Sequence, residues 1–171
     1  MCPQPFRESV RAFAPLHDGA TAGAEADVEV AAGGAVAARV PREQGSLAAG
    51  RLITRVHRFR DYGVVLPASA SIEGIVVRLD ARADSTSGSP KLCVQLSWHG
   101  GASWTSAKTT STLSTSERTY LLGGATNTWG RTWSAANLAN GALRVRVISL
   151  ASSTSRDFSL DWVAVKVHYT S

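Results

Sequence analysis

The carboxylates of this chain are the side chains whose spacing would matter most in a hydrolase. Cleavage of a glycosidic bond needs two carboxylates on either side of it, and acyl transfer needs a nucleophile beside a base. From residue 45 onward the acids are dispersed, and most of them flank turns or fall at solvent-facing strand positions. We therefore expect structural roles for them, no catalytic residue and no enzymatic activity. They are Asp61, Glu73, Asp80, Asp84, Glu117, Asp157 and Asp161.

Metal ligation is the second chemistry to weigh. The histidines have no metal-like spacing and no CxxC motif is present, so a zinc site is not expected. The oxygen-rich loop 85–89, together with Asp80 and Asp84, is the one place suited to calcium, but it has no recognisable calcium-loop motif. We expect no metal and no cofactor. The histidines are His17, His57, His99 and His168.

Five tryptophans, all beyond residue 97, are the one set suggestive of ligand binding. An exposed indole ring stacks on the C–H face of a sugar, while a neighbouring polar side chain bonds the hydroxyls. If 129–133 is a strand, Trp129 and Arg131 share one face, and Trp104 follows a Gly-Gly turn. Trp104, Trp129 and Arg131 are therefore our candidate ligand-binding residues, with core packing as the open alternative for both rings. Core packing is expected for the tryptophans that continue apolar rows, namely Trp98, Trp133 and Trp162.

Side-chain alternation predicts the elements that must position these residues. Segments 75–83 and 92–98 place apolar residues at every second position, as half-buried strands do. Parity changes within 158–169, which indicates either a β-bulge near Trp162 or a strand covered on both faces. About nine or ten such strands, separated by turns, predict an all-β fold: an antiparallel two-sheet β-sandwich. A single helical turn capped by Ser134 is the only helix expected in it.

Charge is divided unevenly along the chain. The formal net charge is +5, with four arginines against six acids in residues 1–44 and fourteen basic residues against seven acids in 45–171. The basic residues are mostly scattered, as are Arg144 and Arg146 on one strand, and only Arg51, Arg55, Arg58 and Arg60 cluster. We interpret this pattern as a solvated face that keeps the protein soluble, and expect no nucleic acid as a partner.

Residues 1–44 differ in composition from 45–171, which we take as the sandwich domain. Segments 24–32 and 35–40 alternate around Gly33-Gly34 and suit a weak β-hairpin. A disordered extension, or a stretch not under selection as protein, remains an alternative.

The cysteines and the N-terminus bear on the compartment. Cys2 and Cys93 are too few for a disulfide framework, and we expect two free thiols. The chain begins without the basic-then-apolar order of a signal peptide, and no apolar run has the length of a membrane helix. An extracellular or cell-surface location, without membrane insertion, therefore needs an export signal on a longer parent chain.

Two segments resemble a known class of module. Tyr62-Gly63-Val64-Val65-Leu66-Pro67, continuing to Val77, is similar to a signature of bacterial and phage modules found in secreted, cell-surface and virion proteins. The tail 156–169 resembles the closing strand of the same modules, so that the likeness covers about residues 50–171. Ala68-Ser69-Ala70 departs from the family, which has glycine next to the proline. The resemblance implies a jelly-roll-like sandwich that serves as a stalk, adhesion or sugar-contacting unit.

The segment 97–104 resembles a degenerate Asp-box hairpin, Ser-x-Asp-x-Gly-x-Thr-Trp. Ser97, Gly101 and Trp104 match, Ser103 replaces threonine, and His99 stands in place of the aspartate. Asp-boxes in sialidases lie away from the chemistry, so the likeness implies hairpin geometry and no activity.

Two functions follow as expectations. The first is a non-catalytic structural or adhesive module of a larger surface, filament or virion assembly, which contacts other subunits or forms a homo-oligomer. The second is a carbohydrate-binding module that holds a surface glycan with exposed tryptophan rings.

Overall fold

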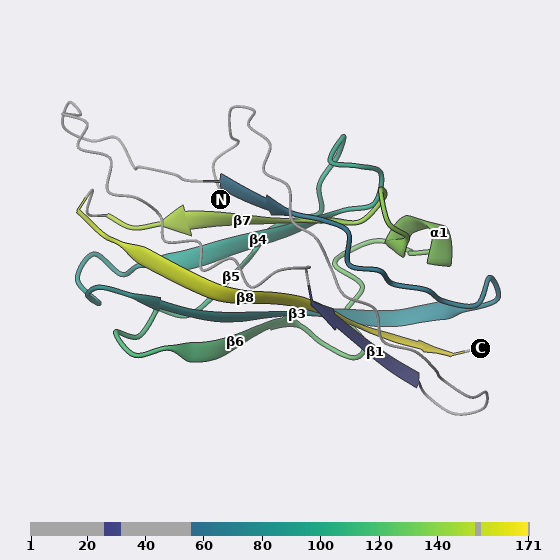
Figure 1. The fold of residues 1–171 in the computed structure, drawn as a ribbon, viewed down its shortest axis with the longest axis horizontal. Helices are drawn as coiled ribbons and strands as arrows, with labels where there is room; N and C mark the ends of the chain where they lie inside the picture. The colour runs from purple at the N-terminus through teal and green to yellow at the C-terminus, as the bar shows by residue number, and fades with distance from the viewer. Residues whose placement is uncertain (1–25, 32–55, 153–154, 171) are drawn as a thin grey trace.

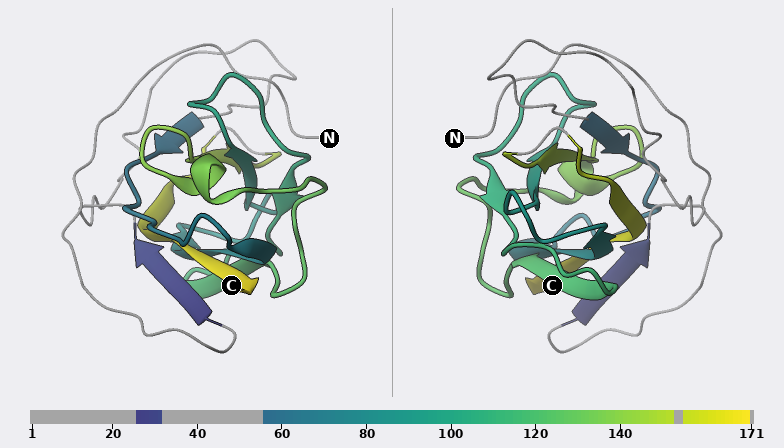
Figure 2. Two further views of the ribbon diagram at one scale, coloured as in Figure 1. Left: turned by 90° about the vertical axis from the view of Figure 1, so that its right-hand side faces the viewer. Right: turned by 90° about the vertical axis from the view of Figure 1, so that its left-hand side faces the viewer.

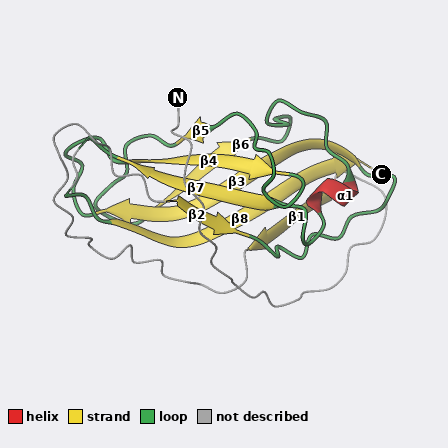
Figure 3. Ribbon diagram, turned by 90° about the horizontal axis from the view of Figure 1, so that it is seen from above, coloured by secondary structure: helices red, strands yellow, loops and turns green. Residues whose placement is uncertain are grey.

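Strands account for nearly all regular structure in the computed structural model, which describes residues 26–31, 56–152 and 155–170. Eight strands and one short helix occur in these residues (Figure 1). Figure 3 shows the helix at one end of the strands. In chain order the elements are β1 Ala26–Ala31, β2 Val56–Phe59, β3 Ser71–Ala83, β4 Lys91–Ser97, β5 Lys108–Thr109, β6 Arg118–Gly123, α1 Ala135–Leu138, β7 Arg144–Leu150 and β8 Phe158–Thr170.

The strands form two four-stranded antiparallel sheets, ordered β1-β8-β3-β6 and β2-β7-β4-β5. β1 pairs with β8, β2 with β7, β3 with β6 and β4 with β5, while β3·β8 and β4·β7 pairs complete the sheets. This is the order obtained by rolling up one long hairpin, which is the jelly-roll arrangement of two packed sheets. Figure 1 shows β2, β7 and β4 above the other sheet, and Figure 2 shows the two layers from the ends. The predicted all-β, two-sheet sandwich is confirmed.

Alternating side chains of both sheets fill the space between them. Leu92, Val94 and Leu96 of β4 are buried in the core cluster, as are Ile75 and the other inward residues of β3. Since successive side chains of a strand point to opposite faces, Cys93, Gln95 and Ser97 belong to the outer face of their sheet. The parity read from the sequence for 75–83 and 92–98 is therefore confirmed.

A register shift interrupts β8 where its parity changes. Asp80 pairs with Trp162 and the next residue, Ala81, pairs with Leu160, so Asp161 is the extra residue of a β-bulge. Leu160 and Val163 consequently both point into the core, and Trp162 points outward with 38% of its surface exposed. Of the two alternatives left open for this segment, the structure has the β-bulge, whereas the expected burial of the Trp162 ring is wrong.

β1 lies within the stretch 1–44 that the sequence analysis separates from the sandwich. It pairs along its whole length with β8, from Ala26↔Tyr169 to Ala31↔Ala164, and forms the edge of its sheet. Residues 26–31 thus belong to the sheet. The hairpin partner expected at 35–40 and the boundary between residues 44 and 45 lie outside the described residues.

The segment 124–133 is a loop and not a strand, which is one reason why the described residues contain fewer strands than expected. Trp129 has a positive φ of 55° and Gly130 follows at 76°, so the chain turns there. The helical turn expected after Ser134 is present as α1, at one end of the sandwich (Figure 2, left). The Ser134 backbone N–H donates to Asn137 Oδ1 at 3.1 Å, and this hydrogen bond caps the start of the helix.

Candidate functional site

Three acids, Glu117, Asp161 and Asp80, lie close enough to influence one another at the β1-β8-β3-β6 sheet. The neighbouring carboxyl of Asp161, through hydrogen bonding and then through its charge, raises the pKa of the Glu117 carboxyl, with smaller contributions from burial and from the charge of Asp80. Glu117 is exposed, and no nucleophile–base pair accompanies it among the hydrogen bonds of the described residues. Asp84 has a structural role, since Oδ1 accepts the backbone N–H of Asp157 at 3.0 Å.

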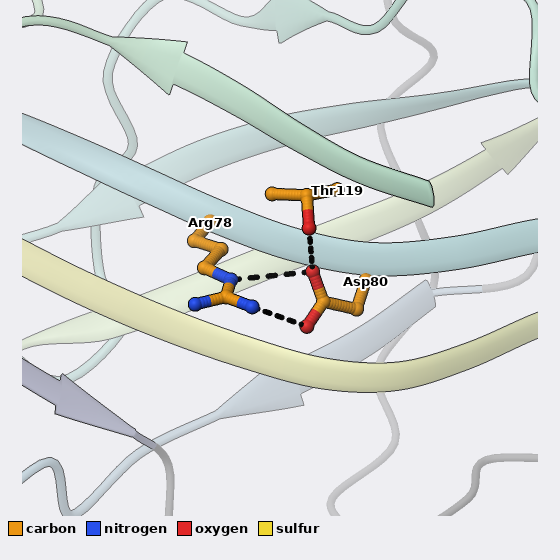
Figure 4. A network of polar contacts seen from close by, with 3 residues as sticks. All are labelled: Arg78, Asp80 and Thr119. Carbon is orange, nitrogen blue, oxygen red and sulfur yellow. Dashed lines mark hydrogen bonds and ion pairs between the residues drawn. The ribbon is translucent and has the colours of Figure 1, made fainter. Parts of the chain in front are cut away.

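Arg78, Asp80 and Thr119 form a tied polar network on this face (Figure 4). Arg78 donates from Nη2 to Asp80 Oδ2 at 2.9 Å and from Nε to Oδ1 at 3.2 Å, and Thr119 Oγ1 donates to Oδ1 at 2.6 Å. Burial alone would raise the pKa of Asp80, but the hydrogen bonds from Arg78 and Thr119 and the charge of Arg78 outweigh it and lower the pKa. The carboxylate is therefore held ionised in one orientation.

Two exposed apolar side chains flank this network. Leu121 is 65% exposed and Trp162 is 38% exposed. Strand register places them at opposite corners of one block of outward-facing residues, which we call the mixed face. One row of the block is Ala164, Arg78 and Leu121, and the next row is Trp162, Asp80 and Thr119.

Trp129 lies in the core. Its side chain is 3% exposed, and its Nε1–H donates to the backbone carbonyl of Ile75 at 2.9 Å. A ring in this position cannot stack on a sugar, so the exposed ring expected at Trp129 is absent. Its N–H needs a partner because burial of an unbonded indole N–H is costly, and the Ile75 carbonyl supplies it.

Arg131 packs between two tryptophans at the same end of the sandwich as α1. Its guanidinium carbon lies 3.8 Å from the ring centroid of Trp98 and 4.8 Å from that of Trp133. Nη2 donates to Asn137 Oδ1 at 3.2 Å and Nε to the carbonyl of Thr132 at 2.9 Å. The guanidinium group of Arg131 thus links the loop before α1 to the end of β4, which is a structural role. Trp133 is buried as expected, and Trp98 is half-buried against the core.

Trp104 lies with two arginines of the other sheet. The guanidinium carbon of Arg146 is 4.2 Å from its ring centroid and that of Arg58 is 5.7 Å away. Arg58 and Arg146 are register partners on β2 and β7, and Gln95 is opposite Arg146 on β4. We call these four residues the arginine face. Trp104 itself is half-buried.

The loop 97–104 delivers Trp104 to this face. The Ser97 hydroxyl accepts the Gly101 N–H at 2.8 Å, and the Thr105 N–H donates to the Leu96 carbonyl at 2.9 Å. The chain therefore reverses after β4 and returns antiparallel to it, as the Gly-Gly turn predicts. Trp104 ends beside outward-facing residues of β4 and β7.

The three candidate ligand-binding residues do not form one site. Trp104 belongs to the arginine face, Trp129 to the core and Arg131 to the loop before α1. Sequence reasoning missed Arg58, Arg146 and Gln95 as partners of Trp104. The alternation of basic residues on β7 was a signal, but the pairing of β2 with β7 was needed to bring the arginines together.

The cysteines and the metal-ligating residue types are the remaining groups that could carry chemistry. Cys93 is disulfide-bonded, which corrects the expected free thiol; the sequence contains one other cysteine, Cys2, which lies outside the described residues. Within the described stretches, no three His, Cys, Asp or Glu side chains gather so as to hold a metal ion. No helix in the same residues has the length and apolar character to span a membrane.

Comparison of the chain with protein-family models, with characterised proteins and with solved structures finds no match. The function of the chain is therefore inferred from its fold and from the side chains of the two outer faces.

Proposed function

We propose that this chain is a non-catalytic jelly-roll module that associates with a second copy of itself through the mixed face, as a structural or adhesive unit of a larger assembly. The observation that carries the proposal is the exposure of Leu121 and Trp162 on either side of a tied ion pair. Exposed aromatic and aliphatic side chains around a rigid polar centre are typical of residues that anchor protein contacts.

Charge supports self-association through this face and not the other. Within the mixed face Arg78 and Asp80 form an ion pair, so the six residues of the block carry no net charge and do not repel a two-fold copy. The arginine face carries cations that have no carboxylate partner among the described residues, and it would repel its own copy. A homodimer of standard size buries about 800 Å² on each partner, so the contact must extend from Leu121 and Trp162 across the sheet.

An extracellular or cell-surface location is part of the proposal. A disulfide such as that of Cys93 persists in oxidising compartments and is rare in reducing ones. The likeness of residues 62–77 and 156–169 to modules of secreted, surface and virion proteins agrees with that location.

Sedimentation velocity over a concentration series tests the proposal, with Leu121→Lys as the variant. The wild type is expected to form a dimer as its concentration rises, and Leu121→Lys to remain monomeric because a charge then replaces an apolar contact. Val65→Lys is the matched control, since Val65 is 85% exposed but lies in the loop before β3. A wild type that stays monomeric, or a control that dissociates as much as Leu121→Lys, contradicts the proposal.

Half-burial of Trp104 favours a second candidate, carbohydrate binding. One part of this ring remains accessible, although the two arginines occupy its neighbourhood. Glycan binding that disappears in Trp104→Ala and persists in Leu121→Lys would support this candidate over self-association.

A further inference from the structure

Two arginines face each other on the arginine face without an opposite charge between them. Arg58 of β2 and Arg146 of β7 are direct register partners, and both guanidinium groups lie over the ring of Trp104. Like charges directly opposite on neighbouring strands destabilise a sheet. Within the described residues neither arginine has a carboxylate within ion-pair distance, in contrast to Arg78 on the other sheet.

Burial raises the free-energy cost of holding these two like charges opposite each other. Arg146 is 2% exposed, so the solvated face expected from the sequence does not apply to it. Burial, and secondarily the charge of Arg58, lowers the pKa of Arg146. The Nε of Arg58 is also buried, and it has no hydrogen-bond partner among the residues that the structure describes. A buried donor without a partner on a cation costs free energy until an acceptor reaches it.

Arg146 is nevertheless held in a fixed orientation. Gln95 donates from Nε2 to the Thr105 carbonyl at 2.8 Å, which turns its Oε1 toward β7. That oxygen accepts hydrogen bonds from both Nε and Nη2 of Arg146. The Trp104 ring packs against the guanidinium from the side. Such support removes much of the ordering cost that a flexible arginine pays on binding a ligand.

We propose that Arg58 and Arg146, over Trp104, form a binding site for an oxyanion group, that is a carboxylate, sulfate or phosphate of a ligand. One such group between the guanidinium groups cancels their repulsion and supplies the acceptor that Arg58 Nε lacks. The neutral Gln95 orients Arg146 without neutralising it, so the charge remains available to the ligand. This site lies on the opposite sheet from the mixed face and goes beyond the proposed self-association.

Thermal unfolding in sodium sulfate, phosphate or acetate, each against sodium chloride at equal ionic strength, tests the site. Binding to the folded state raises the unfolding temperature in a saturable way. For a chain of this size each kcal/mol of binding adds about 2–4 °C, so we expect a saturating rise of a few degrees for at least one of the anions. The ranking of the three distinguishes a planar carboxylate from a tetrahedral group as the natural ligand.

Arg58→Gln identifies the residues responsible. It is expected to abolish most of the anion-specific rise, while in chloride it unfolds no earlier than the wild type because the repulsion is gone. Arg82→Gln is the matched control, since Arg82 is an exposed arginine on β3 of the other sheet, and it should retain the full rise. Arg58→Lys keeps the charge but lacks the Nε donor, so it should bind more weakly with an unchanged fold.

Three results overturn the site. These are no anion-specific rise in the wild type, an equal rise in Arg58→Gln, and an equal loss in Arg82→Gln. Dimerisation measured by sedimentation remains a separate readout, because it depends on Leu121 and not on Arg58. Failure of one proposal therefore leaves the other to be judged by its own experiment.

Discussion

Replacement of Trp129 by alanine separates a core role from a ligand-binding role for this ring. The side chain is 3% exposed and its indole N–H bonds the Ile75 carbonyl. Truncation of a buried tryptophan costs about 3–5 kcal/mol of unfolding free energy, and the lost hydrogen bond accounts for about 1 kcal/mol of that. Since domains are stable by only about 5–15 kcal/mol, Trp129→Ala should lose at least about a fifth of the stability.

Urea unfolding followed by far-ultraviolet circular dichroism measures this loss without relying on tryptophan fluorescence. Trp129→Phe keeps an aromatic ring and loses the N–H, so it should cost about 1–2 kcal/mol and remains measurable if the alanine variant does not fold. Trp104→Ala is the matched control, because that ring is half-buried outside the core, and it should cost less than half as much as Trp129→Ala. If Trp129→Ala lowered the free energy of unfolding by less than about 1 kcal/mol, the reasoning would be refuted and the ring would have to lie at the surface.

Two further predictions concern the backbone and acid stability. Gly123→Ala should cost several kcal/mol, because φ is +101° and a Cβ there would lie 2.0 Å from the Ile75 carbonyl oxygen; Gly130→Ala, with φ of +76° and nothing within 4 Å, should cost only the backbone term of about 1–2 kcal/mol. Equal unfolding midpoints in urea for the two variants would contradict this. Because the folded-state pKa of Asp80 is lowered, its contribution is present above the unfolded pKa of about 4 and is lost as pH falls through the folded pKa. Asp80→Asn should thus be less stable than the wild type at pH 7 and approach it in acid, and a constant difference from pH 7 to 2 would count against the network.

Most of what could be predicted from the sequence came from the local alternation of apolar and polar residues along the strands. On β3 and β4 the period of two assigned the correct face to Ile75 and Leu92 because one face of each strand is buried and the pattern needs no knowledge of the partner strand. The same reasoning offered a bulge in β8 as one of two alternatives, and it placed the Trp162 ring inside. Once Asp161 is the extra residue, the alternation resumes at Val163 and leaves Trp162 on the outer side.

Failures of sequence reasoning arose where the answer depends on distant segments. Trp129 and Arg131 share parity only if the chain is extended between them, and the turn at Trp129-Gly130 removes that premise. The bond that fixes the Trp129 ring comes from Ile75 on β3, which alternation cannot identify. Each of these contacts is set by the roll of the sheets and not by neighbouring residues.

The jelly-roll order explains why the two outer faces have different chemistry. β3 lies in the middle of one sheet, and its outward residues Arg78 and Asp80 lie two positions apart and form an ion pair, so these two charges neutralise each other. In the other sheet the roll pairs β2 with β7, which brings Arg58 opposite Arg146 from distant parts of the sequence. A local sequence pattern could not have balanced the charge of these two arginines. β4, which lies between β7 and β5, contributes the neutral Gln95. A surface that is neutral can meet its own copy, whereas one that retains two fixed cations needs an anion from elsewhere.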